Sequence, residues 1–201
     1  MAKPIPDGYP RVTPYLIIDG ASAAIEFYGS VLGATERMRM PTPDGKVGHA
    51  ELELGDSLVM LADEFPQMGA RSPKSVGGTP VSLHVYVEDA DSVYDRAIQA
   101  GAKALSPMED KFYGDRSGQF EDPFGHQWSV ATHVEDVTPE EMAKRASAAM
   151  AAAVSTPTRP SCRSRCGARS RAGRCRNETP ARCLVRLLPT GGGRRGNSGT
   201  H

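Results

Sequence analysis

One pattern of secondary structure occurs twice in this sequence, and this internal repeat limits the folds that the chain can adopt. Residues 12–64 contain a short apolar run, an amphipathic helical segment and three further strand-like segments, and residues 81–133 contain the same series. In each copy a glycine, Gly33 or Gly101, stands where the C-cap of the helix belongs. The repeat predicts two β-α-β-β-β modules of about equal length, and therefore an α+β fold with paired mixed sheets and flanking helices.

Hydrophobic periodicity assigns the individual elements, because strands alternate every second residue and helices repeat every three to four. The expected elements of the first module are strand 12–18, helix 21–32 and strands 35–40, 49–54 and 57–62. Those of the second module are strand 81–87, helix 89–100 and strands 103–106, 119–121 and 126–132. Between these elements, 65–80 is expected as a linker loop and 114–118 as a polar loop. A last helix is expected over 138–153.

Composition changes sharply after residue 154. Of the chain's 24 basic residues, 11 are arginines in 155–201, a segment with one acidic residue and all the cysteines. The cysteines lack the paired C-x2-C spacing of a zinc site, and the segment has little apolar content with which to order itself. We expect an N-terminal arm over 1–11, a domain over 12–154 and a disordered tail. Zinc or nucleic-acid binding by the tail is the less favoured interpretation. The four cysteines are Cys162, Cys166, Cys175 and Cys183.

The part of the chain before the tail contains no cysteine, which is typical of proteins in a reducing compartment. Its early apolar run, Tyr15–Ile18, is too short for a signal-peptide core or a membrane span. We therefore expect a cytoplasmic protein without membrane contacts.

Six short motifs have the form and order found in a known superfamily. They are Val12–Leu16, Ala24–Tyr28, Gly48–Glu51, Asp89–Asp91, Tyr113–Arg116 and Asp122–Trp128. Together they resemble the vicinal oxygen chelate superfamily, which includes glyoxalase I, extradiol dioxygenases and bleomycin resistance proteins, and most of all its PhnB-like, glyoxalase-like branch. The resemblance covers roughly residues 8–145. It implies that each module curls into half of a cup, and that the protein forms a homodimer, since members often pair or exchange modules.

The resemblance also implies one metal ligand on the first and one on the last strand of each module. Those positions hold Thr13, Met60, Ser82 and Ser129, where the family pattern has His, Gln or Glu. Hydroxyls and a thioether are poor ligands for zinc, nickel or iron. We therefore expect no metal cofactor. The alternative is a divalent metal such as Zn, Ni or Fe, held in a register shifted by two residues.

Histidine and glutamate side chains are the candidate catalytic groups. His84 follows Ser82 by two residues, so both point to one face of their strand. His84 could serve as a general base or a substrate donor, or equally as a hydrogen-bonded wall residue. His49 and Glu51 also share a face and could form an acid–base or metal pair. A solvent-facing edge of an antiparallel strand is the favoured interpretation of that pair.

Two further residues could contact a ligand. The planar guanidinium of Arg116, in its expected loop, suits an anionic group. An ion pair of Arg116 with Asp115 or Glu121 is about as well supported. Tyr15 could line the cup or simply pack against it.

Two functions remain open at this point. The first is binding of an anionic or carbonyl-bearing small molecule without metal, as bleomycin resistance proteins do, with Tyr15, Met60, Ser82, His84, Arg116 and Ser129 as ligand contacts. The second is a glyoxalase-like lyase or isomerase with non-standard ligands drawn from His49, Glu51 and His84. The sequence leaves open whether the protein is an enzyme.

Overall fold

The computed structural model describes residues 3–155, all of which belong to one compact unit that spans Met1–Pro157. All the cysteines and arginines of the expected tail lie outside the described residues. The expectation that the tail is disordered therefore also concerns residues outside the described part. No helix in the described part is long and apolar enough to span a membrane.

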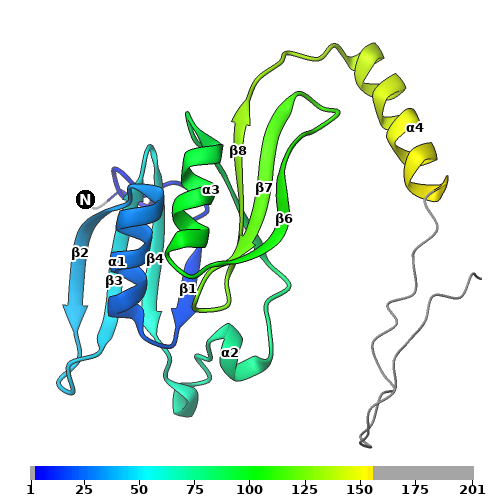
Figure 1. Ribbon diagram of the computed structural model, residues 1–201. Coiled ribbons are helices and arrows are strands. Elements are labelled where there is room, and N and C mark those ends of the chain that lie inside the picture. Colours follow the sequence, from blue (N-terminus) through cyan, green and yellow to red (C-terminus); the bar gives the residue numbers. More distant parts are fainter. Residues whose placement is uncertain (1–2, 156–201) are drawn as a thin grey trace, which may run out of the picture. The chain divides into compact units, whose positions relative to one another are not determined.

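Both modules have the β-α-β-β-β series, and each builds a four-stranded mixed sheet (Figure 1). Module one consists of β1 (Tyr15–Ile18), α1 (Ala21–Leu32), β2 (Thr35–Pro41), β3 (Val47–Leu54) and β4 (Ser57–Asp63), with the strand order β1-β4-β3-β2. Module two consists of β5 (Ser82–Tyr86), α3 (Ala90–Gln99), β6 (Lys103–Asp110), β7 (Asp115–Glu121) and β8 (Gln127–His133), with the order β5-β8-β7-β6. In each sheet the first strand pairs parallel with the last and the other pairs are antiparallel. The predicted fold class is confirmed, and neither sheet is closed.

Some predicted boundaries were wrong. The expected strand 103–106 extends to Asp110, and the expected loop 114–118 lies almost entirely within β7. The sequence pattern does not indicate this hairpin, because β6 is an edge strand whose outer side faces solvent, and such a strand can contain many polar residues. Its register shifts around Pro107, as expected where proline interrupts a ladder. The linker contains two short helical turns, η1 (Pro66–Met68) and α2 (Pro73–Val76).

Helices α1 and α3 lie side by side and cover the same side of the two sheets (Figure 1). Helix α1 buries a stripe that includes Phe27, Tyr28 and Val31, and α3 buries Val93 and Ala97. These side chains join the inward-facing residues of both sheets in one hydrophobic core. Among residues 3–155, no helix covers the opposite face of either sheet.

A buried carboxylate links the modules within this core. Asp122 is 4% exposed and accepts hydrogen bonds from the backbone N–H groups of Phe124 and His126, both at 2.9 Å. It also accepts from the Tyr28 hydroxyl at 2.7 Å and from the Trp128 indole at 3.0 Å. Tyr28 comes from module one and the other partners from module two. This one side chain therefore joins α1 to the β7–β8 turn.

Helix α4 (Pro139–Ser155) begins where the sequence predicts and extends slightly beyond the expected end. The Thr138 hydroxyl accepts from the backbone N–H of Glu141 at 3.3 Å, as an N-cap does. Arg145 then ties the helix to the segment before it through Glu135, at 2.7 and 2.8 Å.

Candidate functional site

Equivalent rows of side chains cross the two sheets. In module one the row runs over β1, β4, β3 and β2 as Tyr15, Met60, Glu51 and Met38. In module two it runs over β5, β8, β7 and β6 as His84, Ser129, Gln119 and Ser106. Residues directly opposite each other in paired strands share a face. Their strand neighbours, such as Leu61 and Val130, point into the core, so each row lies on the face without a helix, which we call the open face.

The open face of module two contains a polar cavity of about 340 Å³. His84 Nδ1 lies 3.0 Å from the Ser129 hydroxyl oxygen, and Ser129 is only 8% exposed. With Ser82, which also lines the cavity, the structure brings together three residues that the sequence analysis named as candidates. The complete lining is Ser82, His84, Ser106, Lys111, Tyr113, Ser117, Gly118, Gln119 and Ser129. A histidine within hydrogen-bonding distance of a serine hydroxyl can exchange a proton with it or with a bound ligand.

A chain of charged and polar groups continues from this cavity. Asp115 is 3% exposed and accepts from the Tyr86 hydroxyl at 2.8 Å, while His133 Nδ1 lies 2.8 Å away on its other side. His133 Nε2 is 3.1 Å from Asp136. Burial raises the pKa of Asp115, but the hydrogen bonds from His133 and Tyr86 outweigh it and hold the pKa below its ordinary value. The same contacts with Asp115 and Asp136 raise the pKa of His133.

A second cavity of about 680 Å³ runs between the modules beside β5. Its walls are largely apolar, with Val12 and Leu58 from module one and Val85 and Trp128 from module two. His84 lines both cavities and therefore stands at the boundary between the polar and the apolar space. Cavities of this size and composition, with few polar groups, are typical of small-molecule sites.

The open face of module one is built differently. Glu51 is 3% exposed and accepts from the hydroxyl of Tyr9, at 2.8 and 3.1 Å for its two oxygens. His49 Nε2 lies 3.4 Å from Glu51, and His49 Nδ1 lies 2.9 Å from the Tyr15 hydroxyl. The interpretation of His49 and Glu51 as a solvent-facing edge was wrong, because β2 covers the edge of β3 and Tyr9 covers the carboxylate. The sequence gives no signal for Tyr9 in its proline-rich arm.

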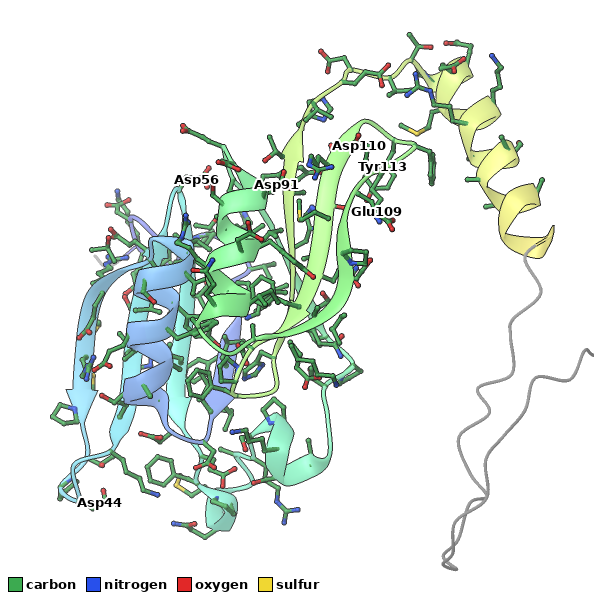
Figure 2. The ribbon with its side chains drawn as sticks, viewed as in Figure 1. Asp44, Asp56, Asp91, Glu109, Asp110 and Tyr113 are labelled. Carbon is green, nitrogen blue, oxygen red and sulfur yellow. The ribbon has the colours of Figure 1, made fainter. Side chains whose placement is uncertain are left out.

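Arg116 does not lie with the candidate site residues of either open face. Its guanidinium contacts Asp91 of α3 at 2.6 and 2.7 Å and Asp110 of β6 at 3.1 Å; Figure 2 labels both carboxylates. The expected partners Asp115 and Glu121 were wrong. Since β7 already begins at Asp115, strand parity turns Arg116 toward the helix side of the sheet, away from His84. The two carboxylates raise the pKa of Arg116, and a role for it in ligand binding has no support from this geometry.

Comparison with known proteins identifies the family. The family model described as Glyoxalase/Bleomycin resistance protein/Dioxygenase superfamily matches residues 11–130. The chain belongs to this superfamily. An uncharacterized protein of Mycobacterium bovis is 45% identical over 136 residues, which are 66% of this chain and 90% of that protein.

Solved structures agree with this membership. TioX from Micromonospora has a TM-score of 0.50 at 27% identity, over 62% of this chain and 99% of that chain. The PhnB protein from Bacillus cereus shares the fold, with a TM-score of 0.50 at 21% identity over 61% and 99% of the two chains. The predicted resemblance to the vicinal oxygen chelate superfamily, including PhnB-like proteins, is confirmed.

The superfamily implies a divalent metal, and the residues of this member do not fit one. Thr13 lies before β1 and donates to the Pro10 carbonyl at 3.4 Å, and Ser129 is engaged by His84. Met60 and Ser82 complete the four positions. Within the described chain, no three His, Cys, Asp or Glu side chains are grouped so as to hold a metal ion. Strand pairing sets Tyr15 opposite Met60 and His84 opposite Ser129, two residues after Thr13 and Ser82. In this register one imidazole stands with two hydroxyls and a thioether, and that set is also unsuited to zinc, nickel or iron.

Proposed function

We propose that this protein binds a small molecule on the open face of module two, and that it does so without the usual divalent metal. The observation that carries this proposal is the polar cavity at the hydrogen-bonded pair His84 and Ser129. Serine hydroxyls, Lys111 and Tyr113 surround that pair with donors. Donors in this number suit a ligand with carbonyl or anionic oxygens. An apolar part of the ligand would extend past His84 into the larger cavity.

The test is a thermal-shift screen of small carbonyl compounds and anions, followed by calorimetry of the strongest ligand with variants. His84→Ala and Ser129→Ala should each weaken binding. His49→Ala is the matched control, since it removes a histidine from the other open face. Loss of a charge-assisted contact costs roughly 1.5–3 kcal/mol, so the affinity should fall about ten- to a hundred-fold. Equal affinity of wild type and both module-two variants would rule out this site.

A second candidate function is catalysis by a glyoxalase-like lyase or isomerase. The observation in its favour is the contact between His49 and the buried Glu51 on module one, together with Tyr15. Paired titratable groups of this kind suit proton transfer next to a carbonyl group. A hemithioacetal substrate, assayed with and without added Zn, Ni or Fe, tests this function. Turnover that disappears in Glu51→Gln would favour the enzyme over the binding protein.

A further inference from the structure

The N-terminal arm places one side chain on the open face of module one. Residues 3–8 are exposed, whereas Tyr9 is partly buried against the sheet. Its hydroxyl reaches both oxygens of Glu51, at 2.8 and 3.1 Å. The hydrogen bond to Glu51 raises the pKa of the Tyr9 phenol above its ordinary value. A carboxylate that is 3% exposed is thus bonded to a hydroxyl from a peripheral segment.

Arg37 recognises the ring of the same tyrosine. Its guanidinium carbon lies 4.7 Å from the centroid of the Tyr9 ring, a cation–π distance. Its Nη1 donates to the Gly8 carbonyl at 3.3 Å, and its Nε lies 3.7 Å from Glu51. The register between β2 and β3 shifts between Glu36 and Met38, and a shift of this kind re-aims the side chain at that position. Two charged side chains of the sheet therefore contact one phenol: Glu51 binds its hydroxyl and Arg37 packs against the face of its ring.

Little else attaches this part of the arm to the domain. Within the described residues, the hydrogen bonds between residues 3–9 and the sheet are those of Tyr9 with Glu51 and of the Gly8 carbonyl with Arg37. The ion pair of Lys3 with Asp7 stays inside the arm. A segment held by so few contacts can dissociate locally at small cost.

We propose that the Glu51–Arg37 face of module one is a binding site for hydroxyaromatic molecules, and that Tyr9 occupies it as an internal ligand that an external phenol displaces. Glu51 accepts a hydrogen bond from the phenolic hydroxyl and Arg37 covers the ring. A tethered phenol competes at a high effective concentration, so the wild-type protein binds an external phenol more weakly than a protein that lacks Tyr9. This inference shares one premise with the proposed function, namely that small molecules bind to the open face of a module.

Titration of the full-length protein with p-cresol, followed by NMR or calorimetry, tests the proposal. Tyr9→Ala should bind p-cresol at least about tenfold more tightly than wild type, because the internal competitor is gone. Tyr9→Phe, which keeps the ring and loses the hydroxyl, should show a smaller gain. Adding Glu51→Gln to Tyr9→Ala should remove most of the gain. For toluene, which has the ring without the hydroxyl, the increase in affinity from wild type to Tyr9→Ala should be far smaller than for p-cresol.

Three results would overturn the proposal: no tighter binding by Tyr9→Ala, a gain that persists with Glu51→Gln, or an equal gain for toluene. Circular dichroism and thermal melting of each variant exclude misfolding as the cause, and Tyr94→Phe is the control for loss of a tyrosine hydroxyl elsewhere. Failure here with a His84-dependent ligand still binding to module two would leave the proposed function intact. Failure of every ligand on both faces would reject the proposed function as well.

Discussion

At the scale of single residues, the two open faces differ in how far their polar side chains are exposed to solvent. Glu51 is buried beneath Tyr9, whereas His84 is exposed in its strand and contacts Ser129 at the edge of two cavities. The counterpart of Glu51 in module two is Gln119, and that of His84 in module one is Tyr15, so corresponding positions of the repeat have different chemistry. A buried carboxylate needs hydrogen-bond donors, and an exposed imidazole remains available to a ligand.

Residue-scale electrostatics predict a pH window for the Asp115–His133 pair. Asp115 has a lowered pKa, so its contribution to stability is complete above about 3.8 and is lost as pH falls through the folded-state pKa. His133 has a raised pKa, so its contribution is complete below about 6.5 and is lost as pH rises through its folded-state pKa. The pair should therefore stabilise the fold most between these two values.

NMR titration of the imidazole protons should give His133 a pKa above 6.5, and Asp136→Asn should lower it. The lowering follows because Asp136 is one of the two carboxylates that contact the ring. A pKa at or below 6.5 in the wild-type protein would contradict the geometry. Asp91→Asn is the control, because that carboxylate pairs with Arg116 instead.

At the scale of elements, the connection between α1 and the β7–β8 turn depends on Asp122. Tyr28→Phe removes one of its four donors and should lower the free energy of unfolding by about 1–2 kcal/mol. Asp122→Ala leaves several buried donors without a partner and should cost about 3–5 kcal/mol. Urea unfolding measures both changes.

The matched control for Tyr28→Phe is Tyr94→Phe. The Tyr94 hydroxyl makes no hydrogen bond among the described residues, so its removal should change stability by less than about 0.5 kcal/mol. Equal effects of the two tyrosine variants would show that the Tyr28–Asp122 bond is not a link between the modules.

The sequence predicts most elements because repeated periodicity, glycine C-caps and the N-cap at Thr138 are local signals. It misplaces the β6–β7 hairpin because edge strands tolerate polar residues, and strand pairing depends on a distant partner. Because of that error Arg116 was expected near the ligand site. The start of β7 determines which of its residues share a face of the sheet, and Arg116 lies on the helix side. Strand parity predicts that His84 and Ser82 share a face, whereas Ser129, which lies 3.0 Å from His84, was a candidate only through the family resemblance. Tyr9 could not be found in this way, because its contact with Glu51 spans the arm and the sheet.

At the scale of the whole molecule, large apolar side chains are exposed on both modules, and a second copy would cover part of this surface. Tyr15 is 47% exposed, Tyr86 61% and Met40 53%. We therefore predict a homodimer, which sedimentation velocity would show at micromolar concentration. Met40→Lys should weaken it, whereas Met150→Lys on α4, at a residue 70% exposed, should leave it intact. A monomer at this concentration, or equal effects of both variants, would contradict the prediction.

The central claim is that the ligand binds through His84 and Ser129 without a metal. Calorimetry with the ligand from the screen, before and after treatment of the protein with a chelator, tests it most directly. The predicted result is equal affinity in both states, with elemental analysis finding no stoichiometric transition metal and His84→Ala weakening binding about ten- to a hundred-fold. Binding that is lost on chelation and restored by zinc, nickel or iron would contradict the claim.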